Sequence, residues 1–258
     1  MPELPDLQVF SSNLNKRLKG LTVTKVEIKI ARKLNVTKDA LKKALTGAAI
    51  KTVYREGKEI YISFDNHNVL ALHLMLHGGL YFIDGDELKN HTIMALLFDN
   101  DTGLCLTDWQ GMATPTLNPA EKPAPDALSD EITVEFLKEA LKTRAIIKNV
   151  LLDQKIIRGI GNAYADEILW DAGISPFSIS NKIPGAAIKK LKKSIRKVLA
   201  NAEKQIRKKD PGIISGEIRD FLPIHNAKKT ESPTGAPILQ KVAGGRKTYY
   251  TEEQQLYK

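Results

Sequence analysis

The sequence predicts an α+β protein. An antiparallel β sandwich flanked by helices is expected in the N-terminal half, and a helical domain with a small β-hairpin in the C-terminal half. Three observations predict this class. Short apolar runs separated by turn residues fill most of residues 20–110. Four prolines then cluster between residues 115 and 125. Beyond them, apolar residues recur at helical spacing.

The N-terminal half begins with a helix, because Leu7, Phe10, Leu14 and Leu18 recur at helical spacing and Gly20 ends the pattern. Strand-like runs follow at residues 26–30, 60–64, 69–75, 80–83, 92–98 and 104–107. Turn residues at 65–68 and 99–103 separate neighbouring runs, and residues 38–45 predict a short helix between the first two strands. This order of elements is typical of a sandwich.

The C-terminal half begins after a proline-rich stretch, residues 115–130, which is the predicted linker. Thr133 is the expected N-cap of a helix that reaches Leu141. A long amphipathic helix follows, whose apolar face carries Ile188, Leu191, Ile195, Val198, Leu199, Ala202 and Ile206. The other face is nearly all lysine and arginine. The polar stretch 223–258 predicts a small hairpin, with turns at Gly235 and Gly244-Gly245.

Composition limits the possible functions. The 258 residues allow one large or two medium domains, and a formal net charge of +9 suits either a polyanionic partner or a solvated basic surface. Cys105 is the only cysteine, so we expect no internal disulfide and a buried thiol in a reducing cytosol. No secretory segment and no run of 18 apolar residues is present, so we expect neither export nor a membrane span.

The first residues carry a possible nucleophile. Removal of Met1 would leave Pro2 as a terminal secondary amine, whose pKa of roughly 7.7–8 keeps much of it uncharged at cellular pH. Such an amine can attack a sugar carbon and form an iminium adduct, and the carboxyl group of Glu3 could move the protons required. By itself, this pattern is more typical of an ordinary helix N-terminus.

A second motif changes that interpretation. Residues 148–176 contain Leu151-Leu152-Asp153-Gln154, then Gly159-Ile160-Gly161-Asn162, then Tyr164-Ala165-Asp166-Glu167. This segment closely resembles the helix–two-turns–helix motif of the formamidopyrimidine-DNA glycosylase and endonuclease VIII family. The opening Pro2-Glu3-Leu4-Pro5 is similar to the catalytic N-terminus of that family.

The resemblance covers nearly the whole chain and implies a domain organisation. Residues 1–114 would form the catalytic β-sandwich domain, followed by the linker 115–130. Residues 131–222 would form the helical DNA-binding domain with the helix–two-turns–helix motif. Residues 223–258 would form a finger hairpin. The protein is then expected to be a monomer of the bacterial cytosol or nucleoid that needs no cofactor and binds double-stranded DNA containing damaged bases or abasic sites.

The resemblance also implies the chemistry. Pro2 would attack the sugar carbon of a flipped nucleotide, with Glu3 helping to open the sugar and release the base. The iminium would acidify the neighbouring sugar proton and lead to β,δ-elimination. Asp6 stands where the family usually has Glu, which puts its role in doubt. Lys58 matches a family lysine that contacts the phosphate beside the lesion; the alternative is a surface lysine before a strand.

Further residues match DNA contacts of the family. His73 corresponds to a strand histidine that contacts phosphate, although a core histidine is the alternative. Gly161 and Asn162 lie at a helix start where backbone N–H groups and the helix dipole favour a phosphate. Lys155 could support the same phosphate path. Asp166 and Glu167 are expected to hold the helix pair together. For the basic face of the long helix, solvation and direct DNA contact both stay open.

The C-terminus departs from many relatives, which carry a four-cysteine zinc finger. Here the four ligand positions fall on Glu231, Thr234, Thr251 and Gln254, and this set offers neither thiolate nor imidazole. We therefore expect a zincless finger and no metal, with Ile238, Leu239, Tyr249 and Tyr250 packing in place of the ion. Arg246 keeps the position of the finger arginine that grips phosphate.

Two departures concern the substrate. Relatives fill the gap left by the flipped base with Met, Arg and Phe. Here the first position falls on Leu76, and the second loop lacks the Arg-Phe pair, so that Trp109, Gln110 or Met112 would substitute. A core position is the alternative for Met112. The stretch between Phe221 and the finger is also some ten or more residues shorter than in the oxoguanine enzymes, where it caps the flipped base.

These departures favour a rival function, a non-catalytic damaged-DNA-binding protein that keeps the family's clamp. The matches at Pro2, Glu3, Lys58, Asn162 and Arg246 favour the enzyme. A third possibility, a structural DNA- or RNA-binding protein, gives the N-terminal motif no purpose. The sequence therefore predicts a base-excision-repair DNA glycosylase with an abasic-site lyase activity.

Overall fold

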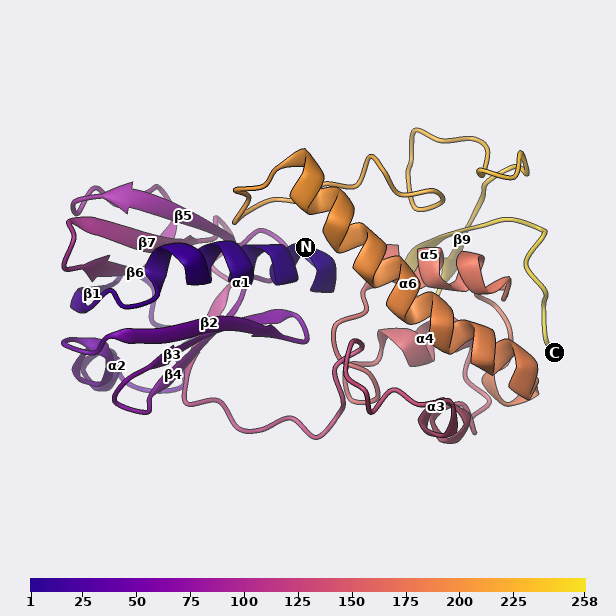
Figure 1. The fold of residues 1–258 in the computed structure, drawn as a ribbon, viewed down its shortest axis with the longest axis horizontal. Coiled ribbons are helices and arrows are strands. Elements are labelled where there is room, and N and C mark those ends of the chain that lie inside the picture. The colour runs from indigo at the N-terminus through magenta and orange to yellow at the C-terminus, as the bar shows by residue number, and fades with distance from the viewer. The chain divides into compact units, whose positions relative to one another are not determined.

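The computed structural model describes residues 1–258, which divide into two compact units (Figure 1). The first unit consists of residues 1–2, 6–121 and 207–217, and the second of residues 3–5, 122–206 and 218–258. Residues 3–5 therefore group with the C-terminal half, although helix α1 (Leu4–Leu18) continues into the first unit. The mixed α+β class predicted from the sequence is confirmed.

The first unit holds two four-stranded antiparallel sheets. One has the order β1-β6-β7-β5 and consists of β1 (Val23–Ile28), β5 (Gly79–Asp84), β6 (Thr92–Phe98) and β7 (Thr102–Thr107). The other has the order β2-β3-β4-β8 and consists of β2 (Ile50–Glu56), β3 (Glu59–Phe64), β4 (Val69–His73) and β8 (Thr114–Leu117). Helix α2 (Lys38–Leu45) lies between β1 and β2 in the chain, as predicted.

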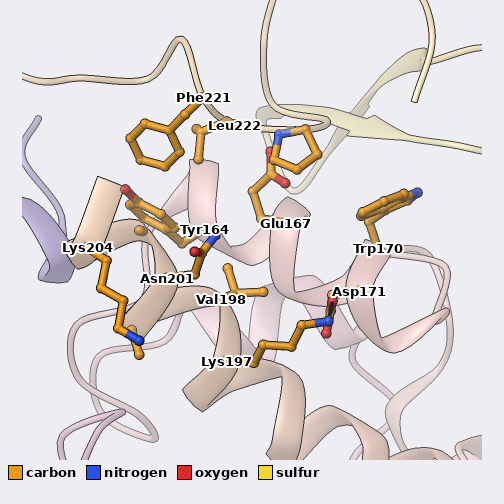
Figure 2. Close-up of a pocket in the computed structure, with 13 residues that line it drawn as sticks. Tyr164, Glu167, Trp170, Asp171, Lys197, Val198, Asn201, Lys204, Phe221 and Leu222 are labelled. Carbon is orange, nitrogen blue, oxygen red and sulfur yellow. Dashed lines mark hydrogen bonds and ion pairs between the residues drawn. The ribbon is translucent and has the colours of Figure 1, made fainter. Parts of the chain in front are cut away.

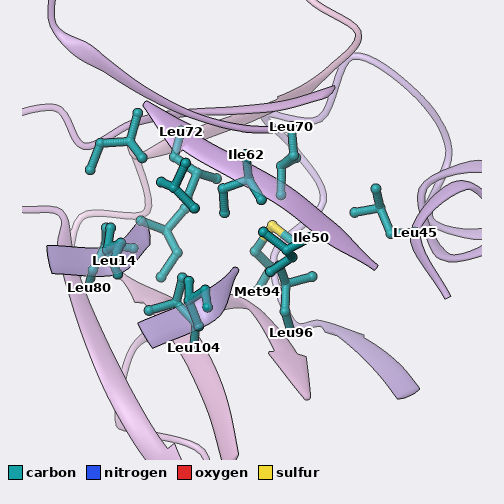
Figure 3. Packing of buried hydrophobic residues seen from close by; sticks show 14 of the residues in the cluster. Leu14, Leu45, Ile50, Ile62, Leu70, Leu72, Leu80, Met94, Leu96 and Leu104 are labelled. Carbon is teal, nitrogen blue, oxygen red and sulfur yellow. The ribbon is translucent and has the colours of Figure 1, made fainter. Parts of the chain in front are cut away.

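Residues from both sheets and from α1 share one hydrophobic core (Figure 3). In β3, the alternate residues Ile60, Ile62 and Phe64 are almost fully buried, which is the period-two pattern of a strand with one face on a core. Leu14 of α1 and Leu96 of β6 belong to the same cluster. Burial of each such side chain contributes about 1.5–3 kcal/mol, so this core stabilises the loops that the sheets carry.

The strands differ from the sequence-based prediction in several places, and β1 begins and ends earlier than the predicted run 26–30. Strand β2 was not predicted, because its polar residues Lys51, Thr52 and Arg55 mask the burial of Ile50 and Val53. Strand β4 ends at His73, before the predicted limit of Met75, because Met75 has a φ of 56° and leaves the extended region. Residues 115–117, at the start of the expected linker, form part of β8 at the edge of its sheet.

The second unit is mainly helical. Its helices are α3 (Val134–Ala140), α4 (Ile147–Leu152), α5 (Asn162–Ala172), the short 3₁₀ helix η1 (Ser180–Lys182) and α6 (Gly185–Lys209), whose last three residues group with the first unit. Their apolar faces meet in one core that includes Leu151, Ile168, Leu191 and Ile195. None of the helices is both long and apolar enough to cross a membrane.

Local sequence signals explain the ends of these elements. Thr133 caps α3 as predicted, with its hydroxyl accepting the N–H of Phe136 at 3.0 Å. The predicted hairpin is formed by β9 (Leu239–Ala243) and β10 (Arg246–Tyr250), which Gly244 and Gly245 connect. Within the expected linker, Ala127 donates its N–H to the carbonyl of Arg158, so this part of the linker packs on the two-turn segment.

Candidate nucleic-acid interface

The start of helix α5 binds a carboxylate of the chain itself. The Glu3 carboxylate accepts the N–H of Ala163 at 3.0 Å and that of Tyr164 at 3.4 Å. These two donors are among the first N–H groups of α5, which have no partner inside the helix and attract negative charge. Glu3 is almost fully buried there. The helix N-terminus therefore holds Glu3, the residue next to Pro2 in the chain.

This contact explains the glycines of the motif. A Cβ atom on Gly161 would lie 2.2 Å from Cδ of Glu3, and one on Gly159 would lie 2.5 Å from a methyl group of Leu4. Gly159 also has a φ of +106°. The sequence suggested that Gly161 leaves room for a phosphate. In the structure the missing side chain of Gly161 leaves room for Glu3, because the helix N-terminus packs against residues 3–4.

The two turns before α5 are fixed by Gln154. Its amide donates to the carbonyls of Leu152 and Ile160 at 2.9 and 3.0 Å, and its side-chain oxygen accepts the N–H of Gly159 at 2.9 Å. Lys155 lies exposed on this segment, where Asp153 accepts its backbone N–H at 2.8 Å. The side chain of Lys155 is thus available at the surface, as the predicted phosphate contact requires.

The structure brings Asn162 together with the finger. Its side-chain amide donates to the carbonyl of Lys247 at 2.9 Å, while its side-chain oxygen is buried without a hydrogen-bond partner. Arg246, the preceding residue of β10, is exposed. The predicted DNA contacts of this unit are Lys155, Gly161, Asn162 and Arg246. Two of them, Asn162 and Arg246, lie at the junction between α5 and β10.

A buried ion pair supports this junction. The fully buried ammonium of Lys148 lies 2.6 Å from the Asp166 carboxylate and donates to the hydroxyl of Thr248 at 2.7 Å. The second Asp166 oxygen accepts the N–H of Tyr249 at 3.0 Å and lies 2.7 Å from Nδ1 of His225. Burial lowers the pKa of Lys148, and the charge of Asp166 opposes this shift. Asp166 therefore joins α4 to α5, as expected, and also binds the finger.

Glu167 holds the chain that leads to the finger. One of its oxygens accepts the N–H of Ile224 at 2.9 Å and that of His225 at 2.6 Å. Burial raises the pKa of Glu167 to about 7, although the two N–H donors favour the charged form. The sequence suggested that Glu167 holds the helix pair together, but its hydrogen bonds reach residues 224–225 instead.

Polar contacts close the finger at the four positions that correspond to zinc ligands. The Glu253 carboxylate accepts the hydroxyl of Thr234 at 2.7 Å and that of Thr251 at 3.3 Å, which connects the two turns. Gln254 accepts the N–H of Thr251 at 2.8 Å and donates to the carbonyl of Ile174 at 2.8 Å. Glu231 forms an isolated bridge with Pro237. Glu253 was not singled out in the sequence, because it lies beside a ligand position and not at one.

The first unit carries the remaining predicted catalytic and phosphate residues. Pro2 and Asp6 are buried, and Asp6 lies in the first turn of α1. Lys58 is half-buried in the tight turn between β2 and β3. His73 ends β4, and its Nδ1 accepts the N–H of Met75 at 3.1 Å, so the ring proton lies on Nε2. With Met1 present, the terminal amine pairs with the Glu217 carboxylate.

Two loops of the first unit expose large apolar side chains. Leu76, after β4, is 60% exposed, and Trp109, after β7, is 61% exposed. The rings of His77 and Trp109 lie 4.8 Å apart, so the loops contact one another. Gln110 is exposed beside Trp109, whereas Met112 is half-buried. Exposed residues of this kind fit the predicted wedge, and the structure brings both loops together.

The loop that carries Trp109 is rigidly built. The buried Asp108 accepts the N–H groups of Gln110, Met112 and Ala113 at 2.7–2.9 Å. Arg32 donates to the carbonyls of Gln110 and Gly111. Neither Asp108 nor Arg32 was identified from the sequence. Gly111, three positions after Asp108, was a signal for a turn at this aspartate, but Arg32 lies 79 positions before Gly111 and gave none.

These features define a class of protein. Its members have a β sandwich, followed along the chain by a helix–two-turns–helix unit and a small finger. Two family models match the chain, the formamidopyrimidine-DNA glycosylase N-terminal domain over residues 1–114 and the H2TH domain of the same enzymes over residues 124–211. The chain belongs to the formamidopyrimidine-DNA glycosylase family, whose members are DNA glycosylases with abasic-site lyase activity.

Individual relatives agree with this assignment. The formamidopyrimidine-DNA glycosylase of Carboxydothermus hydrogenoformans is 34% identical over 202 residues, covering 78% of this chain and 76% of the relative. That of Pelotomaculum thermopropionicum is 31% identical over 268 residues, covering 97% of each. The structure of Lactococcus lactis Fpg with abasic-site DNA has a TM-score of 0.88 at 25% identity, covering 98% of this chain and 99% of that chain.

Proposed function

We propose that this protein, a DNA glycosylase of DNA repair, uses Pro2 to excise damaged bases and to cut the strand at the resulting abasic site. The observation that carries the proposal is the position of Glu3, held by the N–H groups of Ala163 and Tyr164. Because Pro2 is covalently joined to Glu3, the same contact limits where the Pro2 nitrogen can lie. The chemistry of a terminal secondary amine next to a carboxyl group then supports nucleophilic attack.

The proposed reaction proceeds in balanced steps. The Pro2 nitrogen forms a bond to the sugar C1′, the bond from C1′ to the base breaks, and the base leaves with a proton. Glu3 donates a proton to the sugar ring oxygen as the C1′–O bond opens, which gives the iminium. Loss of a C2′ proton then expels the 3′ phosphate, a second elimination expels the 5′ phosphate, and water releases Pro2.

The proposed DNA contacts come from both units. Lys155, Asn162 and Arg246 of the second unit would bind phosphates, and Lys58 and His73 of the first would bind phosphates beside the lesion. The net charge of +9 supplies general attraction to the backbone. Solved relatives support this ligand class, because Lactococcus lactis Fpg is described in complexes with abasic-site DNA and with DNA that contains an oxidised pyrimidine.

The two exposed side chains Leu76 and Trp109 are proposed to fill the space left by the flipped nucleotide. Both are more than half exposed on contacting loops, and an apolar side chain that enters a base stack stabilises the opened duplex. Gln110 lies beside them. Asp108 and Arg32 would hold the loop that carries Trp109 in one conformation before DNA binds. Little conformational freedom would then be lost on binding.

Borohydride trapping on an abasic duplex tests the proposal. The mature protein should give a covalent complex, and Pro2→Gly should lose most of it. A form with extra residues before Pro2 should give none, because an amide nitrogen is not nucleophilic. Lys58→Gln is the matched control and should still be trapped, since its loss removes a phosphate contact and not the secondary amine. Normal trapping by the extended form would disprove the role of Pro2, and binding without trapping by the mature protein would favour the non-catalytic alternative.

A further inference from the structure

The outward face of α6 is strongly cationic. Residues 185–206 carry seven lysines and arginines and one carboxylate, Glu203. The solvent-facing stripe, here named the α6 ridge, consists of Lys189, Lys190, Lys193, Lys197 and Lys204, all of them exposed. Lys197 pairs with Asp171 at 2.6 Å, whereas Lys189, Lys190, Lys193 and Lys204 have no carboxylate within ion-pair distance. The ridge therefore retains an uncompensated positive charge.

A hollow of about 500 Å³ borders the ridge (Figure 2). Lys197, Val198, Asn201 and Lys204 of α6 form one wall, and Tyr164, Glu167, Trp170 and Asp171 of α5 form another. Phe221, Leu222 and Pro223 complete the lining. The hollow thus combines aromatic rings with the ammonium groups of two ridge lysines. Figure 2 shows Trp170 and Phe221 on separate sides of this space.

The carboxyl groups of the hollow compensate one of its two lysines, Lys197, and leave Lys204 uncompensated. Asp171 is neutralised by its ion pair with Lys197. Glu167 is buried, both N–H donors of residues 224–225 bind one of its oxygens, and its pKa of about 7 leaves a large neutral fraction at cellular pH. An anionic ligand therefore meets little repulsion from the walls.

The hollow lies on another side of α5 from Asn162. Asn162 and Asp166 project from one face of α5 and contact Lys247 and Tyr249 of β10. Tyr164, Glu167 and Asp171 project away from that face, as the 3.6-residue period requires, and Trp170 projects between the two; all four line the hollow. A ligand of the hollow is therefore distinct from a duplex bound at Asn162 and Arg246.

We propose that the α6 ridge and this hollow form a second site, which binds single-stranded nucleic acid. The ridge lysines would pair with consecutive phosphates, and one or two bases would enter the hollow beside Trp170 and Phe221. Proteins bind single strands by this combination of a cationic track and aromatic side chains. A duplex keeps its bases stacked inside and offers none to the hollow. An acidic peptide offers negative charge but no planar bases. Neither ligand would therefore contact both the ridge lysines and the aromatic side chains. The inference does not depend on the chemistry of Pro2.

Trp170 provides a direct readout, because the chain has two tryptophans and the other can be replaced. In a Trp109→Phe background, an undamaged oligothymidylate should quench Trp170 fluorescence in a saturable way. Lys193→Gln with Lys204→Gln should weaken this binding roughly ten-fold and flatten its salt dependence by about 0.7 per lost phosphate contact. Arg246→Gln should leave the quenching curve unchanged. In the otherwise unmodified chain, the double lysine variant should still cut an abasic duplex at the normal rate.

Several results would overturn the proposal. They are absence of quenching, an unchanged affinity in the double lysine variant, and loss of quenching in Arg246→Gln. A paired duplex of equal length that binds equally well would show a simple polyanion surface. Equal quenching by a polyglutamate peptide would show an acidic-peptide site. Lys43→Gln with Lys51→Gln, two exposed lysines of the first unit, is the matched charge control and should leave the affinity within about two-fold.

Discussion

Gly161 shows how the absence of one Cβ atom decides the geometry of the contact between Glu3 and α5. Its backbone has φ −120° and ψ −170°, an extended conformation that any residue adopts. The requirement is therefore for space, because an added Cβ would overlap the Glu3 carboxyl group. Glu3 in turn depends on two N–H groups 160 positions away. The absence of a side chain at Gly161 thus makes room for the Glu3 carboxyl group.

Gly161→Ala should slow excision of a damaged base by about 100-fold, because it displaces Glu3 and with it Pro2 by an ångström or more. Single-turnover excision on a duplex with an oxidised pyrimidine measures this effect. Gly185→Ala is the control, since its Cβ would meet nothing closer than Lys138 at 3.9 Å. Normal excision by Gly161→Ala would mean that the Glu3 contact has no role in catalysis.

At the scale of elements, side chains of α5 hold the finger and the segment before it. Asp166 binds β10 and His225, and Glu167 binds residues 224–225. Both carboxylates are almost fully buried, so each needs its partners to compensate for lost solvation. These long-range contacts connect α5 to the finger and to residues 224–225. The sequence had predicted only that Asp166 and Glu167 hold the helix pair together.

The stability of this attachment should depend on pH. The folded protein keeps the proton on Glu167 up to about pH 7, whereas the unfolded chain releases it near its ordinary pKa of 4.5. Stability therefore falls as the pH rises from about 4.5 to about 7, by roughly 3 kcal/mol from this group. Urea unfolding at pH 5 and pH 8 should show that Glu167→Gln removes this fall. Glu139→Gln, a change in an exposed ion pair, should leave the fall in stability unchanged. The same dependence of unfolding free energy on pH in both variants would contradict the role of Glu167.

The finger should function without metal, because Glu253 joins Thr234 and Thr251 where relatives have zinc ligands. Metal analysis should find no stoichiometric zinc, and a chelator should leave the affinity for abasic DNA unchanged. Glu253→Ala should weaken that affinity roughly three- to ten-fold by loosening the two turns. Glu252→Ala, its exposed neighbour, is the control. Loss of binding on chelation would show that the hydroxyl and carboxyl groups do not replace the metal.

At the scale of the whole molecule, the short stretch between Phe221 and the finger bears on substrate choice. Residues 221–225 are anchored on α5, with Leu222 and Ile224 buried, so this part of the chain does not form a long loop over a flipped base. Selectivity for a flipped base comes from contacts in its pocket, and abasic sites need none of these. The protein is therefore expected to favour abasic sites and poorly stacked lesions.

Excision of 8-oxoguanine opposite cytosine should be slower than that of a formamidopyrimidine or an oxidised pyrimidine, because each lost contact to a buried polar group costs about 1–3 kcal/mol. Matched duplexes compared under single-turnover conditions measure this, with cleavage of an abasic site as the control for intact chemistry. Removal of 8-oxoguanine at the rate of the best lesion would show that the short segment between Phe221 and the finger does not limit the pocket.

The sequence by itself determined the fold class, the capped helix after Thr133, the finger hairpin and the residues that match the family. These features follow from local periodicity, caps, turns and short motifs, all of which act within a few positions of the chain. Strand β2 and the loop support from Arg32 were not found, because their signals are weak or distant.

Only the tertiary structure decided which side chains contact one another. Glu3 binds α5 across 160 positions, Glu253 joins two turns of the finger, and Lys148 pairs with Asp166 inside the core. The physical reason is that hydrogen bonds and ion pairs act over about 3 Å, so they depend on the path of the chain in space and not on distance along it.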